Sequence, residues 1–365
     1  MTKPIESLYM HFPFCKHLCN YCDFYKKVAK DRASELNAYH QLLLQSFTEH
    51  QKLMDLYGYS WGKLKTLYIG GGTPSLWGET GSDFLSETLT KNKIELDAHC
   101  EFTLEVNPGG WSQEGIEKFQ KIGANRFSLG IQSLNEELIK KLDRVHSLED
   151  AFQTLEYFQK IGANFSMDFM LGLPESKKLG RNVLAELEQA LEFRPSHFSV
   201  YILTVKDNYT HYTALPDEEW IEREYLSVSN FLKEKGYVHY EVSNFALPQR
   251  ESLHNLSYWQ SNTVAAIGPS ATGFFSEERY RYKWKTLAPD CDFEILTPEQ
   301  FQLEKMYMAL RSSVGLNLKE NTHPVFQAWI KRGLASEVNH QLILTSKGFL
   351  VLDSLLDELF SLKLI

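Results

Sequence analysis

Short apolar segments alternate with longer amphipathic segments six times along the first 203 residues, and this alternation constrains the fold more than any other feature. The predicted strands are Ser7–Phe12, Thr66–Gly70, Glu101–Val106, Arg126–Gly130, Phe165–Leu171 and His197–Leu203. The predicted helices between them are Ala33–Tyr57, Asp83–Lys93, Gln113–Ile122, Leu148–Ile161 and Arg181–Phe193. Such alternation is typical of βα units in a parallel sheet.

Six units are too few for a closed eight-stranded barrel, so the pattern favours an α/β fold with a partial (β/α)6 TIM-like barrel. A doubly wound open sheet fits the periodicity as well. The motif KIGAN stands between helix and strand at 121–125 and again at 160–164. These segments resemble equivalent turns, with glycine stopping the helix.

The alternation fades after about residue 210. Residues 236–288 are rich in aromatics and short β-type runs, and from Pro298 the pattern is helical, with a strand-like LIL before the last helix. We therefore predict a barrel over 1–215, an aromatic-rich connecting region over 216–295, and a small helical, α+β or winged-helix-like domain over 296–365.

Composition excludes several classes of protein. Thirty-eight Lys and Arg against 47 Asp and Glu give a net charge of −9, which argues against a general nucleic-acid-binding surface. No apolar run approaches the roughly 18 residues of a membrane span, and the first residues do not read as a secretory signal. We expect a cytoplasmic protein with no transmembrane segment and no nucleic-acid partner.

Three of the five cysteines fall within eight residues, at Cys15, Cys19 and Cys22, directly after the first predicted strand. In a chain without an export signal, clustered thiols indicate metal or redox chemistry before disulfides. Three thiolates can hold three corners of a cubane iron–sulfur cluster and leave one iron open to a further ligand. Zinc, with His11 or His17 as fourth ligand, is the alternative. Cys100 and Cys291 stand alone and are expected to be ordinary core or surface thiols.

Polar residues and glycines follow the ends of the other predicted strands. The second strand ends in the turn Gly70–Pro74, whose bare backbone amides can approach a polar ligand. Glu105 and Asn107 end the third strand, Gln132 follows the fourth, and Asp168 lies in the fifth. These positions match the end of a βα barrel that carries its chemistry.

The ordered motifs resemble the radical S-adenosylmethionine (SAM) superfamily. More narrowly, they resemble the group that holds the oxygen-independent coproporphyrinogen III oxidases (HemN) and the haem chaperones (HemW). The resemblance runs through almost the whole chain, in LYMHFPFC, GGGTPS, EVNP, RFSLGIQS, MDFMLGLP, HFSVYIL, HYEVSNFA and HNLSYW.

The resemblance implies that Cys15, Cys19 and Cys22 bind a [4Fe–4S] cluster whose open iron takes SAM. An electron from the cluster then cleaves SAM to methionine and a 5′-deoxyadenosyl radical. Tyr9, Gly71 and Glu105 match SAM-contacting positions of the family. Thr272 stands at a further one, in the stretch Gly268–Thr272, which in relatives usually ends in Ala-His. A second SAM site described for the oxidase maps to Tyr21, Gly72, Thr73, Gln132, Arg144, Asp168 and Leu203.

Two functions of different classes fit this group: decarboxylation of coproporphyrinogen III, and delivery of haem. The oxidase pattern has a fourth cysteine at the position of Phe24 in this chain. It also has an N-terminal arm of some fifty residues before the first strand, whereas this chain begins eight residues before Tyr9. The motif HNLSYW matches one associated with haem binding in the HemW group. Its His254 can ligate iron, while Tyr258 and Trp259 can pack against the porphyrin.

The resemblance therefore favours a HemW-like haem chaperone without coproporphyrinogen oxidase activity that binds or cleaves SAM. Its implied partners are haem, apo-haemoprotein acceptors and an electron donor such as flavodoxin or ferredoxin. A radical SAM enzyme with an unrelated substrate is a third hypothesis. Lys206 stands where many relatives have Glu, a charge reversal near the end of the sixth predicted strand.

Overall fold

A computed structural model of the chain describes residues 2–205 and 209–362. Within this part, nine strands form one sheet in the order β7-β8-β6-β5-β4-β3-β2-β1-β9. Its first six strands are parallel and follow the chain order: β1 (Lys3–Phe12), β2 (Tyr59–Gly71), β3 (Leu96–Val106), β4 (Arg126–Gln132), β5 (Asn164–Leu171) and β6 (His197–Ile202).

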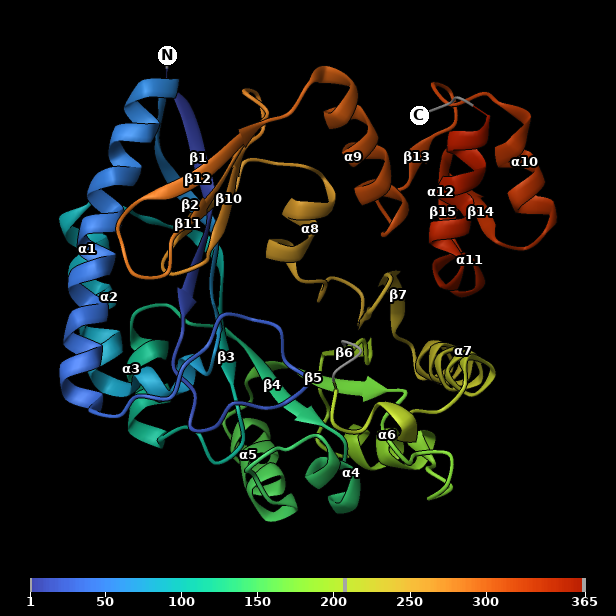
Figure 1. The fold of residues 1–365 in the computed structure, drawn as a ribbon, viewed down its shortest axis with the longest axis horizontal. Coiled ribbons are helices and arrows are strands. Elements are labelled where there is room, and N and C mark those ends of the chain that lie inside the picture. The colour runs from blue at the N-terminus through green and yellow to red at the C-terminus, as the bar shows by residue number, and fades with distance from the viewer. Residues whose placement is uncertain (1, 206–208, 363–365) are drawn as a thin grey trace.

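Helices connect these strands and cover the outer face of the sheet, as Figure 1 shows. They are α1 (Arg32–Tyr57), α2 (Gly78–Lys91), α3 (Gln113–Lys121), α4 (Glu136–Lys141), α5 (Leu148–Lys160) and α6 (Val183–Leu191), with the short 3₁₀ helix η1 (Pro74–Trp77) before α2. Local sequence sets several ends: Asp31 caps α1, Ser147 and Asp150 form a capping box on α5, and Gly58 ends α1 at φ 72°.

The uninterrupted strand order excludes the doubly wound alternative, because that fold reverses its order at a switch point near the middle of the sheet. The sheet is a partial barrel: β1 pairs with β9 (Ala265–Ile267) on its free side, and β6 pairs with β8 (Asn244–Ala246) rather than with β1. Both KIGAN segments turn from helix to strand with glycine at positive φ, at Gly123 and Gly162.

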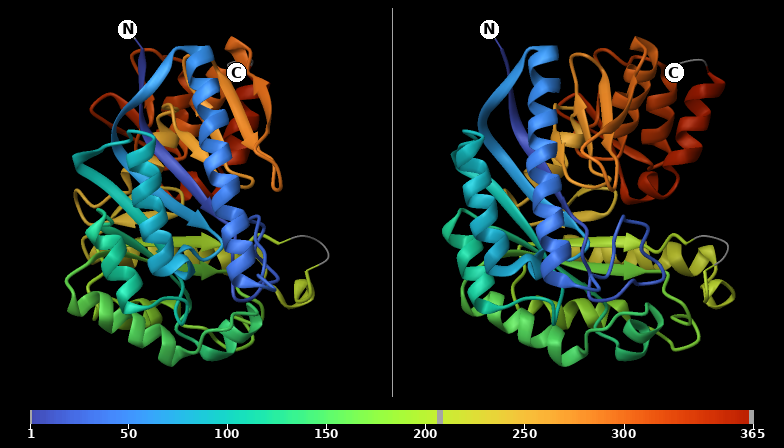
Figure 2. Two further views of the ribbon diagram at one scale, coloured as in Figure 1. Left: turned by 90° about the vertical axis from the view of Figure 1, so that its left-hand side faces the viewer. Right: turned by 60° about the vertical axis from the view of Figure 1, so that its left-hand side comes forward.

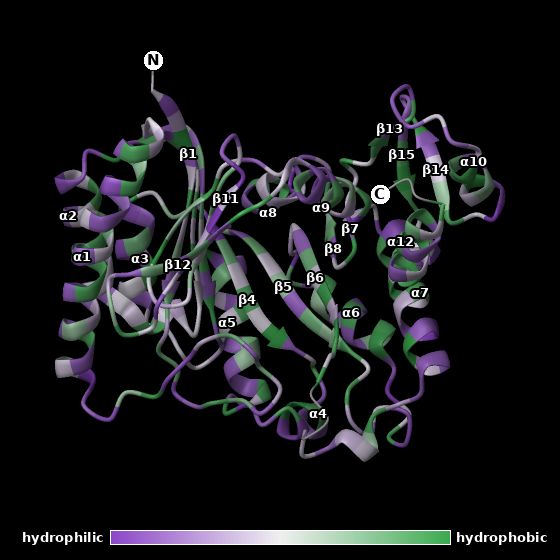
Figure 3. Cartoon of the chain, turned by 45° about the horizontal axis from the view of Figure 1, so that its top comes forward, coloured by the Kyte–Doolittle hydropathy of each residue, from purple (hydrophilic) through white to green (hydrophobic). Residues whose placement is uncertain are grey.

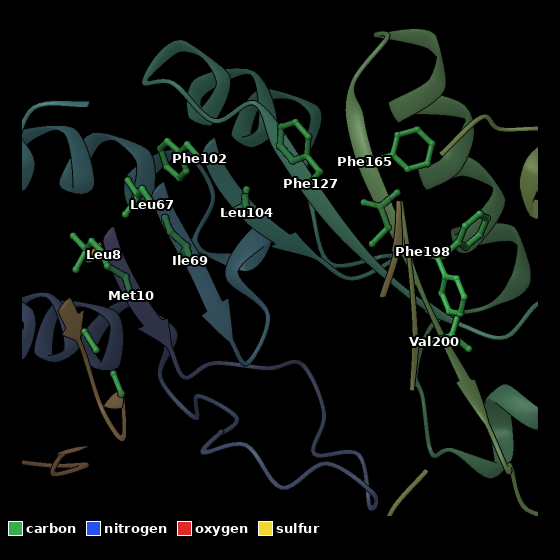
Figure 4. Packing of buried hydrophobic residues seen from close by; sticks show 14 of the residues in the cluster. Leu8, Met10, Leu67, Ile69, Phe102, Leu104, Phe127, Phe165, Phe198 and Val200 are labelled. Atoms are coloured by element: carbon green, nitrogen blue, oxygen red, sulfur yellow. The ribbon is translucent and has the colours of Figure 1, made fainter. Parts of the chain in front are cut away.

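Every second residue of the parallel strands points into the core between the sheet and its helices. Leu8 and Met10 on β1, and Leu67 and Ile69 on β2, are fully buried there. Figure 4 shows these side chains together with Phe102, Leu104, Phe127, Phe165, Phe198 and Val200 of the following strands. Figure 3 shows the matching stripes of hydrophobic and hydrophilic residues along the helices. The opposite, inner face of the sheet is left for polar residues.

The rest of the chain packs beside the barrel, as Figure 2 shows. Between β6 and β9 lie η2 (Tyr212–Ala214), α7 (Glu218–Glu234), β7 (Val238–Glu241) and α8 (Leu253–Trp259). A second sheet, antiparallel, is formed by β10 (Thr272–Phe275), β11 (Tyr280–Trp284) and β12 (Cys291–Ile295). The C-terminal part holds α9 (Pro298–Leu310), β13 (Leu316–Asn317), α10 (Pro324–Lys331), β14 (Ala335–Val338), β15 (Gln341–Leu344), α11 (Ser346–Leu350) and α12 (Leu352–Ser361).

The strands β13, β15 and β14 form a third, antiparallel sheet in that order. Short helices flank it, and Trp329 on α10 and Leu359 on α12 are fully buried. This is the α+β, winged-helix-like arrangement expected at the C-terminus. In the described part of the chain, no helix is long and apolar enough to cross a membrane.

Candidate functional site

The inner face of the barrel carries a row of polar side chains across neighbouring strands. Tyr9 on β1 lies in register with Tyr68 on β2, and Glu105 on β3 lies in register with Ser128 on β4. Ser128 donates hydrogen bonds to both carboxylate oxygens of Asp168 on β5, at 3.2 and 3.3 Å. The period of two that buries the apolar residues therefore gathers these groups on the opposite face.

The cysteine loop follows β1 and is held against the glycine turn that follows β2. The backbone N–H of Gly72 donates to the carbonyl of Phe12 at 2.7 Å, and that of Thr73 donates to the carbonyl of Phe14 at 2.8 Å. A Cβ on Gly72 would stand 2.7 Å from the Phe14 oxygen, so only glycine fits this close approach.

The same contacts correct the expectation that the amides of this turn are bare. Those of Gly71, Gly72 and Thr73 are all hydrogen-bonded within the protein. The turn positions the cysteine loop and the Glu105 carboxylate instead of offering free donors.

Cys15, Cys19 and Cys22 are free, half-buried thiols that line one cavity together with Tyr21, Gly72, Thr73 and Arg144. A chain of polar contacts reaches this cavity from the inner face. Arg144 donates to the Asn107 Oδ1 at 2.9 Å, the Asn107 Nδ2 donates to the Thr73 hydroxyl at 2.8 Å, and that hydroxyl lies 3.7 Å from the Cys15 sulfur.

Burial raises the pKa of the Cys15 and Cys19 thiols, and the positive charge of Arg144 opposes that rise at Cys19. Metal binding requires thiolates, so a bound metal has to displace these protons. Arg144 supplies a fixed positive charge beside the developing negative one.

The cavity fits a cluster better than a single zinc ion. Both ring nitrogens of His11 are occupied, with Nδ1 3.0 Å from the Tyr9 hydroxyl and Nε2 2.8 Å from the Tyr25 carbonyl. His17 Nε2 lies 2.8 Å from the Asp143 carboxylate. Among the described residues, no three His, Cys, Asp or Glu side chains converge as ligands of one ion. A cubane cluster binds each thiolate to a different iron, so its sulfurs need not converge.

Glu105, the predicted SAM-binding carboxylate, is held in place by two donors. Its Oε1 accepts from the Tyr68 hydroxyl at 2.8 Å, and its Oε2 accepts from the Gly71 amide at 3.0 Å. Burial raises its pKa to about 7, against the opposing effect of these two hydrogen bonds. Glu105 can therefore exchange a proton near neutral pH, or hold a ligand N–H as the carboxylate.

The residues predicted for a second SAM site lie in three places. Tyr21, Gly72, Thr73 and Arg144 share the cysteine cavity. Gln132 ends β4 at φ 69°, a strained conformation for a residue other than glycine, and Asp168, with a pKa raised by burial to about 6, lies on the inner face. Leu203 packs in a small apolar cluster with Leu138, Leu142, Met170 and Leu173, against which Tyr21 also packs.

The motif HNLSYW forms most of the short helix α8, and its three predicted haem residues face different surroundings. His254 is 1% exposed, with Nδ1 2.8 Å from the Thr66 hydroxyl, and its Nε2 has no hydrogen-bond partner among the described residues. Burial lowers its pKa to about 3, so the imidazole is neutral. Trp259 stacks with Arg311, whose guanidinium carbon lies 5.4 Å from the ring centroid.

Tyr258, one helical turn after His254, lines a second cavity of about 450 Å³. Tyr9 and Thr272, both predicted to contact SAM, line the same cavity. The ring of His254 lies behind that of Tyr258, at a centroid distance of 5.3 Å and near a right angle. Lys206 lies outside the described residues.

Two residues that sequence reasoning did not single out belong to this site. Tyr68 stacks on His254 at 5.1 Å and orients Glu105. Asn107, noted only as part of a strand end, links Arg144 to Thr73. The available signal was a polar residue at an inward position of a buried strand for Tyr68, and a polar residue directly after a strand for Asn107.

Comparisons with known proteins agree with this geometry. The model of the radical SAM superfamily matches residues 9–180. The haem chaperone HemW of Lactococcus lactis is 31% identical, over 96% of this chain and 95% of its own length. The chain belongs to the HemW family of radical SAM proteins.

Further relatives come from other organisms. HemW of Escherichia coli is 34% identical over 74% of this chain and 70% of its own length. The mitochondrial radical SAM domain-containing protein 1 of Bos taurus is 31% identical over 95% of this chain and 82% of its own. The solved structure of E. coli coproporphyrinogen III oxidase, HemN, shares the fold with a TM-score of 0.76 at 20% identity, over 98% of this chain and 90% of that one.

Proposed function

We propose that this protein is a cytoplasmic haem chaperone that binds haem and passes it to apo-haemoproteins. Cys15, Cys19 and Cys22 hold a [4Fe–4S] cluster at which SAM binds. The observation that carries the proposal is a juxtaposition within one loop. Its cysteines line one cavity, and its next residues, 23–25, line a second, aromatic-rich cavity that also contains Tyr258 of HNLSYW.

The protein's own residues hold the cluster ligands and the SAM-binding carboxylate. Gly72 lets the cysteine loop lie directly on the turn after β2, and Arg144, Asn107 and Thr73 form the polar contacts that end at Cys15. Tyr68 and the Gly71 amide orient Glu105. A bound and reduced cluster would supply the electron for cleavage of SAM, with a flavodoxin or ferredoxin as its source.

Coproporphyrinogen III oxidation is the second candidate, because the same cysteines and inner-face residues would serve it. Phe24, which stands where the oxidase pattern has its fourth cysteine, is 69% exposed and lies against the second cavity. A phenyl ring cannot supply a thiolate there. This position therefore favours the chaperone.

An anaerobic assay with coproporphyrinogen III, SAM and a strong reductant separates the two functions. We expect about four irons per chain. Mass spectrometry of the porphyrinogen should show no loss of carbon dioxide from its propionates. Decarboxylated product would establish the oxidase and overturn the proposal.

The Cys19→Ser variant tests the ligand assignment in the same experiment. It should lose most of its iron and all SAM cleavage, because one corner of the cluster has no thiolate. Cys291→Ser, which removes a thiol outside the loop, is the control and should keep its iron. Stoichiometric zinc in anaerobically purified wild-type protein would contradict the cluster assignment.

A further inference from the structure

The second cavity lies between three parts of the chain that are far apart in sequence. Its walls come from the end of β1 and the cysteine loop, from the end of α8 with β10 and β11, and from α9. Its volume of about 450 Å³ falls within the range of small-molecule and cofactor sites.

The walls of this cavity are mostly aromatic or otherwise apolar. Eight such side chains line it: Tyr9, Phe24, Tyr25, Tyr258, Ala271, Phe274, Phe301 and Met308. Flat rings and a flexible thioether suit a large planar ligand, because they pack against its faces with little loss of side-chain entropy. Phe24 at the rim is 69% exposed, so a ligand that covers its ring would bury apolar surface.

Two Lys or Arg side chains of the described part of the chain line this cavity, and one of them is free to meet an anionic ligand. Lys283 on β11 lies opposite Thr272 of β10 and is exposed. Within residues 2–205 and 209–362 it makes no ion pair or side-chain hydrogen bond. The neighbouring Arg281, by contrast, already forms ion pairs with Glu294 and Glu304.

We propose that this cavity binds the haem, with its macrocycle between Phe24 and Tyr258 and a propionate on Lys283. The inference rests on the proposed function and adds where the haem lies and which residues outside HNLSYW select it. In this proposal His254 lies behind Tyr258 as seen from the cavity, with the centroids of the two rings 5.3 Å apart. Of the four predicted SAM contacts, Tyr9 and Thr272 line this cavity and Glu105 and Gly71 do not, so the predicted SAM site adjoins the cavity and shares one wall with it.

The test compares haem with haem dimethyl ester, which has the same macrocycle but no propionate charge. Both are titrated, in the same dilute detergent, into cluster-loaded wild-type protein and the variants Lys283→Glu and Phe24→Ala. Lys160→Glu, the same charge change at an exposed position on α5, is the control. Iron content is measured for each protein to show that the cluster is retained.

We expect Lys283→Glu to weaken haem binding by about tenfold and to leave ester binding within about twofold. Phe24→Ala should weaken both ligands alike, because it removes packing and no charge. A Lys283→Glu variant that binds haem like Lys160→Glu would overturn the cavity assignment. Displacement of haem by excess SAM would overturn it too, since the cavity would then be the SAM site. Failure of the wild-type protein to bind haem would overturn the proposed function itself.

Discussion

Glu105 shows how one side chain on the inner face depends on its surroundings. Burial raises its pKa from an ordinary 4.5 to about 7, so the folded protein holds a proton that the unfolded chain releases between these values. Folding stability from this group is therefore present below pH 4.5 and is lost as the pH rises through 7. If SAM is bound by the carboxylate, SAM affinity rises over the same interval.

Replacing Glu105 by Gln removes this titration while keeping most of the shape. We expect Glu105→Gln to gain thermal stability over wild type at pH 8 and to gain less at pH 5. Its SAM affinity should fall and should no longer change between pH 6 and pH 8. Melting temperatures and SAM titrations at these pH values check both points. A SAM affinity that follows pH as in wild type would show that another group titrates.

His254 combines a buried neutral imidazole with an unpartnered nitrogen. We expect His254→Ala to weaken haem binding without loss of cluster iron, and to destabilise the fold by about 2–4 kcal/mol through the cavity and the unpaired Thr66 hydroxyl. Thr66→Val removes the same hydrogen bond but keeps the ring, so it should retain haem affinity. Unchanged haem affinity in His254→Ala would make the residue a core histidine only.

Among the elements, the glycine turn after β2 depends most on a single residue. In Gly72→Ala the new Cβ would meet backbone atoms of residues 12–14 at 2.7–3.0 Å, so the cysteine loop has to move away. We expect this variant to lose most of its iron after reconstitution. Gly162→Ala, at φ 63° and with nothing within 4 Å, adds only backbone strain of about 1 kcal/mol and should keep its iron. Equal iron in the two variants would contradict the role given to the turn.

The sequence predicted the carboxyl ends of the parallel strands better than their beginnings. Strands β1 and β2 begin at Lys3 and Tyr59, whereas the sequence pattern predicted that they begin at Ser7 and Thr66. Lys63 and Lys65 break the apolar run of β2, yet the two strands already pair at Lys3 and Tyr59, with a shift of register between Ile5 and Ser7. Apolar periodicity indicates which residues are buried. The first residues of β1 and β2 pair at a partly exposed end of the sheet, so this pattern could not indicate that they belong to strands.

At the scale of the whole molecule, the sequence predicted the barrel but not what completes it. The strand β9 has three residues, Ala265–Ile267, too few for a recognisable pattern, yet it pairs with β1 more than 250 residues away in sequence. The second cavity has the same origin, since residues 9–25, 258–283 and 301–308 meet only in the fold. Motif matching could find Tyr258 but had no signal for Lys283 or Met308.

An equilibrium haem titration of anaerobically reconstituted, cluster-loaded protein tests the central claim most directly. The account predicts a saturable shift of the haem Soret band at one haem per chain, with the iron of the cluster retained. A linear, unsaturable change with added haem, like that of a protein without a haem site, would contradict it.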